Sequence, residues 1–149
     1  ITTSEEKEER LKEAGASQVL YNPELDFGEI VQALTEDQGA NVVVNTLGAL
    51  AFDACWTSLA QFGRMLIVGD VQGGQVPIRP AEILFKDAQL IGVSGVSLRQ
   101  LQDVEKMVAS GLLKPTISQT FPLEEAVEAF QLMREKRSFG RLTLVPTEN

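Results

Sequence analysis

Apolar side chains recur at two different spacings along this chain, and the spacings predict both helices and strands. Residues 26–38 place Phe27, Ile30, Val31 and Leu34 on one face of an amphipathic helix, at the i, i+3, i+4, i+7 spacing. Spacing and helical propensity together predict further helices over residues 4–14, 49–60, 98–110 and 123–135, and a short one that ends at residue 85.

Two short runs are continuously apolar, which is typical of strands that are buried on both faces of a sheet. They cover residues 42–44 and 65–68, and further strands are predicted over residues 18–21 and 89–93. Because helices alternate with these strands, we expect an α/β fold with a parallel sheet and helices on both of its faces.

The last forty residues have a different pattern. Residues 116–121 and 141–145 alternate apolar and polar side chains, as strands with one solvated face do. The helix predicted over residues 123–135 lies between them. The chain is therefore expected to end in a β-α-β tail whose environment differs from that of the preceding sheet.

Composition and charge exclude several classes of function. The chain has 149 residues and a formal net charge of −8, which argues against a nucleic-acid partner because such partners require a basic surface. It has no histidine and one cysteine, so it cannot by itself form a Ser-His-Asp triad or a zinc site of the usual His/Cys type. Without a membrane-spanning run or a targeting segment, and with a single cysteine, the expected location is the cytoplasm.

Four stretches, taken together in this order and spacing, resemble a known family. They are residues 41–48 (NVVVNTLG), 62–69 (FGRMLIVG), 121–130 (FPLEEAVEAF) and 140–144 (GRLTL). The arrangement resembles the C-terminal part of the medium-chain dehydrogenase/reductase superfamily, and most closely its zinc-independent quinone oxidoreductase and enoyl reductase branch. The opening residues from Thr2 to Ala16 are similar too, so the resemblance covers essentially the whole chain.

The resemblance implies an incomplete Rossmann-like, doubly wound parallel sheet with a C-terminal β-α-β tail. Residues 1–111 are expected to be a partial dinucleotide-binding domain, and residues 112–149 to pack on a catalytic barrel that this chain lacks. The Gly-rich first turn, which would hold a dinucleotide pyrophosphate, is also expected upstream of Ile1. The first strand, which is central in a Rossmann sheet ordered 3-2-1-4-5-6, is missing with this turn, so we expect the isolated sheet to aggregate, depend on a partner or rearrange.

The resemblance also implies that the chain binds NADPH. Thr3, Ser4 and Lys7 follow the family's second strand, where hydroxyls and a lysine suit a 2′-phosphate if Glu5 and Glu6 point away. Six further contacts are implied, mainly at strand ends: Tyr21, Asn45, Thr46, Val68, Gly69 and Arg141. The alternatives are a solvated helix start, an ordinary strand tyrosine, turn residues and a surface arginine.

Three other residues are expected to have no direct role in chemistry. Asp70 is interpreted as a solvated aspartate, and Cys55 and Trp56 as core residues of the helix over 49–60. We predict no catalytic residue and no metal ligand within the chain.

The function implied is that of an NADPH-dependent oxidoreductase, which transfers hydride to the activated C=C of an enone or enoyl thioester, or to a quinone. The isolated chain is expected to be inactive and to form a homo-oligomer, a dimer through residues 89–93. Its partners would be small molecules and neither nucleic acid nor membrane. The alternatives are a zinc-dependent alcohol dehydrogenase of the same superfamily, a receiver-like signalling domain, and a non-catalytic α/β dimerisation domain.

Overall fold

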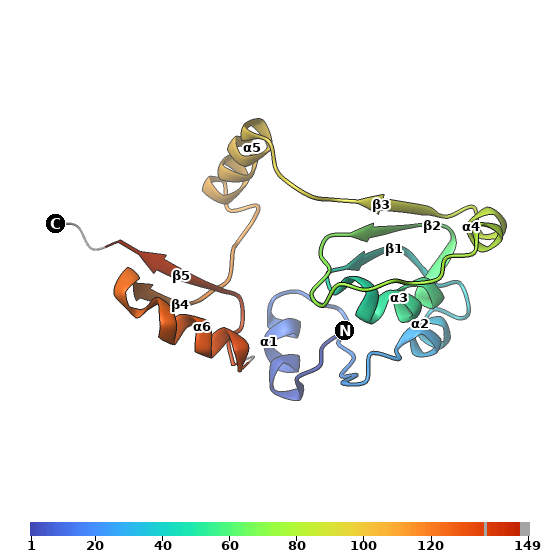
Figure 1. Ribbon diagram of the computed structural model, residues 1–149, viewed down its shortest axis with the longest axis horizontal. Coiled ribbons are helices and arrows are strands. Elements are labelled where there is room, and N and C mark those ends of the chain that lie inside the picture. Colours follow the sequence, from blue (N-terminus) through green and yellow to red (C-terminus); the bar gives the residue numbers. More distant parts are fainter. Residues whose placement is uncertain (136, 147–149) are drawn as a thin grey trace. The chain divides into compact units, whose positions relative to one another are not determined.

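The computed structural model describes residues 1–135 and 137–146, which divide into two compact units (Figure 1). The first unit covers residues 1–95, and the second begins at Val96. The boundary predicted at residue 111 concerns which part of the chain packs on a further domain, and it stays a prediction.

The first unit alternates helices and strands, as the hydrophobic pattern indicates. Its elements are η1 (Glu5–Lys7), α1 (Glu8–Glu13), α2 (Gly28–Leu34), β1 (Ala40–Asn45), η2 (Gly48–Ala51), α3 (Phe52–Ser58), β2 (Leu59–Ile67), α4 (Pro80–Lys86) and β3 (Gln89–Gly92). The helices predicted over 4–14, 26–38 and 49–60 are present but shorter or divided. No helix in the described part of the chain is long and apolar enough to cross a membrane.

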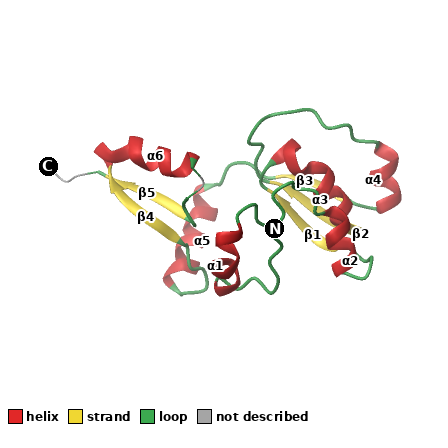
Figure 2. Cartoon of the chain, turned by 90° about the horizontal axis from the view of Figure 1, so that it is seen from below, coloured by secondary structure: helices red, strands yellow, loops and turns green. Residues whose placement is uncertain are grey.

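The three strands form a parallel sheet in the order β1-β2-β3, which confirms the predicted parallel arrangement. Val43, Met65 and Leu90 lie opposite one another across the sheet. They contribute to one hydrophobic core with α3, which packs on β1 and β2, while α2 packs on α3 (Figure 2). Met65 is completely buried and marks the centre of this core.

The prediction that residues 42–44 are buried on both faces is wrong for this chain. Val42 is 53% exposed and Val44 is 58% exposed, whereas Val43 between them packs on the core. Adjacent side chains of a strand point to opposite faces, and α2 and α3 cover only the face that carries Val43. The second face is nevertheless apolar, as in strands that a further layer covers.

The strand predicted over residues 18–21 is also absent. Only one isolated parallel bridge forms there, between Thr2 and Tyr21. The Thr2 amide donates to the Leu20 carbonyl at 2.9 Å, and the Asn22 amide donates to the Thr2 carbonyl at 2.8 Å. A longer strand needs neighbours to pair with, and this segment joins neither sheet of the described structure.

The second unit confirms the predicted β-α-β tail. It contains α5 (Leu98–Ala109), β4 (Ile117–Pro122), η3 (Leu123–Glu125), α6 (Ala126–Arg134) and β5 (Arg141–Val145). Strands β4 and β5 pair in parallel, as a crossover through α6 requires. Phe121 and Ala129 are its buried core residues, so this unit buries little apolar surface of its own.

Candidate functional site

The carboxyl ends of β1 and β2 lie side by side at one edge of the sheet. Asn45 pairs with Ile67, and the Val68 amide continues the ladder by donating to the Asn45 carbonyl at 2.9 Å. The loops that begin at Thr46 and Gly69 therefore leave the sheet together, as predicted. In open parallel sheets, ligands bind in the crevice outside such strand ends.

Asn45 shapes the first of these loops with its side chain. The carboxamide is 1% exposed; its oxygen accepts from the amides of Leu47 at 3.0 Å and Gly48 at 2.9 Å. Its nitrogen donates to the Gly48 carbonyl at 2.9 Å. Because all three bonds stay within the loop, the Asn45 side chain anchors backbone, and the exposed Thr46 is the polar side chain that the loop presents outward.

Gly69 packs against the same loop. A Cβ atom at Gly69 would lie 2.8 Å from the Thr46 carbonyl oxygen, so a side chain here would displace backbone. Gly69 is thus required by the close approach of the two strand ends. Val68 beside it is 47% exposed at the same edge.

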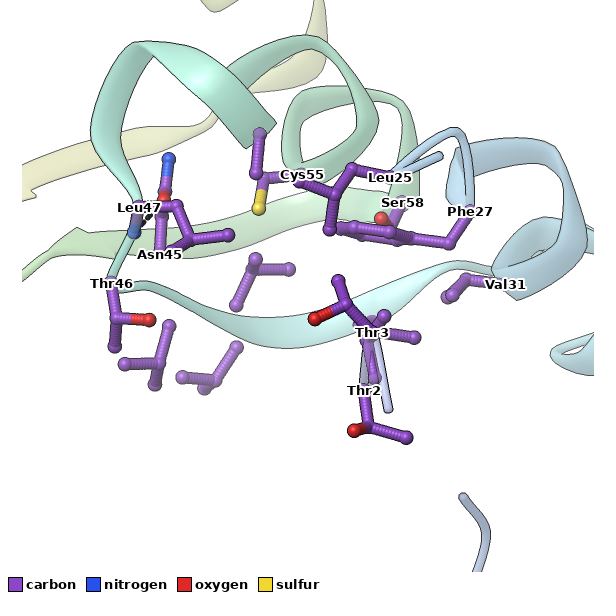
Figure 3. A pocket seen from close by; sticks show the side chains of 16 residues that line it. Thr2, Thr3, Leu25, Phe27, Val31, Asn45, Thr46, Leu47, Cys55 and Ser58 are labelled. Carbon is purple, nitrogen blue, oxygen red and sulfur yellow. Dashed lines mark hydrogen bonds between the residues drawn. The ribbon is translucent and has the colours of Figure 1, made fainter. Parts of the chain in front are cut away.

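A cavity of about 480 Å³ extends from this edge along the unpaired side of β1 (Figure 3). Thr3, Asn45 and Thr46 are the predicted cofactor contacts that line it. Thr2 and Ser58 contribute further hydroxyls, and the remaining lining residues are mainly apolar. The structure thus brings together three of the nine predicted contacts around one cavity.

The predicted phosphate-binding residues lie next to the Thr2–Tyr21 bridge. The Ser4 amide lies 3.2 Å from the Thr2 hydroxyl, and the Lys7 amide donates to the Ser4 carbonyl at 3.2 Å. Tyr21 is 41% exposed. Lys7 ends η1 and is half-buried. Arg141 belongs to the second unit, where it begins β5 and is exposed.

Cys55 is a core residue, as predicted. It is 4% exposed, and burial raises the pKa of its thiol from 9.0 to about 11. The thiol is therefore protonated at neutral pH, which makes it a poor nucleophile. Although Cys55 lines the cavity, its contribution there is apolar.

Trp56, predicted as a core residue, is only half-buried and forms a contact with Lys86 that no local sequence pattern indicates. Its ring stacks on Phe52 with the centroids 6.5 Å apart. The Lys86 ammonium lies 5.2 Å from the Trp56 ring centroid and donates to the carbonyls of Trp56 at 3.0 Å and Leu59 at 2.7 Å. Lys86 thereby fixes the end of α3 from a position 30 residues along the chain.

Two further features of the site bear on its chemistry. Asp70, interpreted from sequence as solvated, accepts a hydrogen bond from the Ala49 amide at 3.2 Å. Among the described residues, no three or more His, Cys, Asp or Glu side chains gather in a group that could hold a metal ion.

Comparison with known proteins identifies the family. A family model described as zinc-binding dehydrogenase matches residues 14–144. The acryloyl-coenzyme A reductase of Sulfurisphaera tokodaii is 28% identical over 98% of this chain and 42% of its own length.

Solved structures agree with this match. The crystal structure of AibC has a TM-score of 0.87 and 33% identity, covering 99% of this chain and 41% of that chain. A mycobacterial protein solved in complex with NADPH has a TM-score of 0.78 and 26% identity, covering 96% and 48%. The chain thus spans less than half the length of these relatives, and the Rossmann-like α/β class is confirmed. This chain belongs to the zinc-binding dehydrogenase family, within the medium-chain dehydrogenase/reductase superfamily.

Proposed function

We propose that this chain is the nucleotide-binding part of an NADPH-dependent oxidoreductase that reduces an activated C=C bond or a quinone. The observation that carries the proposal is the adjacency of two parallel strand ends, joined by the hydrogen bond from Val68 to Asn45. Such an edge is where parallel α/β sheets bind nucleotides. When bound, NADPH would supply the hydride, and the residues of this chain would place it.

The strand ends offer groups suited to the nicotinamide half of the nucleotide. The Thr46 hydroxyl is exposed on the cavity and can donate to, or accept from, a ribose or carboxamide group. Gly69 keeps the second strand end free of a side chain directly beside Thr46. We expect these two residues to form the floor on which the ring lies.

The residues around the Thr2–Tyr21 bridge suit the adenosine 2′-phosphate. Thr3 and Ser4 supply hydroxyls, and the half-buried Lys7 supplies a positive charge. Charge-assisted hydrogen bonds to phosphate favour NADPH over NADH, which lacks this group. Glu5 and Glu6 are exposed, which is compatible with carboxylates that face solvent instead of the phosphate.

Most of the cavity along β1 is not expected to hold the nucleotide. In the family's strand order, 3-2-1-4-5-6, a central first strand lies between the segment at Thr2 and β1. The unpaired edge of β1 fits such a strand, whereas the exposed Val42 and Val44 fit a further layer on the second face of the sheet. We therefore place the nucleotide at the end of the cavity near Thr46, outside the strand ends.

The relatives support the substrate class that we propose. Acryloyl-coenzyme A reductase acts, by its name, on an enoyl thioester, and this chain is similar to it over nearly its whole length. We propose an enoyl thioester, an enone or a quinone as the hydride acceptor. We assign no group of this chain to the polarisation of this acceptor.

A nuclear magnetic resonance titration of the chain with NADPH tests the proposal. The amides of Thr46 and Gly69 should shift with both NADPH and NADH, and those of Ser4 and Lys7 mainly with NADPH. Lys7→Ala should weaken NADPH binding by about fivefold to tenfold, as the loss of one charge-assisted contact from a half-buried lysine implies. Lys12→Ala, on the following helix, should leave it unchanged.

Two results contradict the proposal. One is an NADPH-induced shift pattern that leaves Thr46 and Gly69 untouched. The other is robust turnover of a quinone with NADPH by this chain alone, which would show that the reacting groups lie elsewhere than proposed.

A further inference from the structure

The two loops at the strand ends are joined by contacts beyond the β-ladder. The Val71 amide approaches the Leu47 carbonyl at 3.4 Å, and the Ala49 amide donates to the Asp70 carboxylate at 3.2 Å. The loop of residues 46–49, named here the Thr46 loop, is therefore held from one side by Asn45 and from the other by the loop after β2. Asp70 contributes a charged side chain to this contact.

Gly48 is matched to this contact. It is buried with a φ of +69°, a conformation that side chains other than glycine adopt at a cost. A Cβ atom at Gly48 would collide with the Asp70 side chain and with its Cα atom. The chain thus approaches Asp70 as closely as backbone allows, and the carboxylate lies against the start of η2.

The exposed carboxylate meets an amide at the start of η2. Ala49 lies in the first turn of η2, where amides have no partner within their own helix. The Asp70 carboxylate supplies the acceptor for this amide. Asp70, at the edge proposed to bind nicotinamide, therefore has the Ala49 amide as a backbone partner.

We propose that Asp70 is the positioning residue of this crevice: its carboxylate holds the Thr46 loop in the conformation that presents the Thr46 hydroxyl outward. The relevance to nucleotide binding rests on the proposed function, but the hold on the loop does not. Asp70 need not touch the nucleotide, because it acts through Ala49 and Gly48. Asn45 fixes the beginning of the same loop, so the two residues together leave Thr46 little freedom.

Amide hydrogen exchange in the free chain tests the hold directly. Asp70→Ala should speed exchange of the Ala49 amide by about fivefold to tenfold, as the loss of one hydrogen bond implies, and should shift the Thr46 amide resonance. Asp70→Asn keeps an oxygen acceptor and should restore most of the protection. Asp53→Ala removes a carboxylate from the exposed side of α3 and serves as the matched control.

The proposal is overturned if Asp70→Ala leaves Ala49 exchange and the Thr46 resonance as in the wild type. It is also overturned if NADPH binds the wild-type chain and Asp70→Ala binds it equally well, since a displaced Thr46 should weaken binding by about fivefold. A wild-type chain that does not bind NADPH contradicts the proposed function instead. The exchange rates then still confirm or overturn the role of Asp70.

Discussion

Replacement of Asn45 by alanine is the perturbation whose effect the structure predicts most directly. The side chain is buried at the end of β1 and makes three hydrogen bonds to the backbone of the Thr46 loop. Alanine would leave two amides and one carbonyl without these partners. At about 1 kcal/mol for each hydrogen bond, the free energy of unfolding should fall by about 3 kcal/mol.

Urea denaturation followed by the fluorescence of the single tryptophan, Trp56, measures this effect within the first unit. With a denaturant dependence of about 1.5 kcal/mol per molar for a small domain, the midpoint should fall by about 2 M. Asn41→Ala is the control, because Asn41 lies exposed on the same strand and its loss should cost less than about 0.5 kcal/mol. Equal midpoints for the two variants would refute the loop-anchoring role of Asn45.

Three other predictions concern the core, the strand ends and the open edge of the sheet. Cys55 should resist alkylation at neutral pH because it is buried. Folding raises the pKa of its thiol from 9.0 to about 11, so the contribution of this thiol to the free energy of unfolding should be constant below pH 9.0. That contribution should be lost as the pH rises towards about 11. Rapid alkylation of the folded chain at pH 7 would contradict its burial. Gly69→Ala should destabilise the chain by about 1–3 kcal/mol because its Cβ meets the Thr46 carbonyl, whereas Gly92→Ala, whose Cβ meets nothing, should be neutral in the same urea assay. Equal effects would show that the two strand ends are not in close contact. The chain should self-associate through β3, and Ile91→Lys, on that edge strand, should shift its sedimentation towards monomer; an unchanged sedimentation profile would place the interface elsewhere.

Local sequence patterns were sufficient to predict the helices and strands that bury a regular apolar face. The apolar runs at Val43 and Met65 marked two adjacent parallel strands, and the helical stripe through Phe52 and Cys55 marked the helix that covers them. These features depend on side-chain periodicity, which is a property of consecutive residues.

Features that depend on distant partners were not predictable in this way. The apolar sequence around Val42 and Val44 would be the same whether or not a further layer covered this face of the strand. Tyr21 lies in a segment with strand propensity that forms only a single bridge, because pairing requires neighbouring strands. The partners of Asp70 and Lys86 lie 21 and 30 residues away, and no local pattern indicates them.

The same distinction applies to the candidate site. The location of Thr46 and Gly69 at adjacent strand ends was predictable because strand ends follow from the strands themselves, and their contact with a nucleotide stays a prediction. The carboxamide of Asn45 bonds to the backbone of the loop, which no local sequence pattern indicates, and its contact with the nucleotide stays a prediction. A polar residue at a strand end serves a ligand or the backbone depending on its rotamer, which the sequence does not specify.

The most direct test of the central claim is to locate bound nicotinamide on the chain. Intermolecular nuclear Overhauser effects between the nicotinamide ring protons of NADPH and the chain would do so. Nucleotide binding at the two strand ends should give such effects with the Thr46 methyl group and the Gly69 α-protons. Effects confined to the separate groove lined by Asp26, Glu29 and Asp53, or to the second unit, would contradict it.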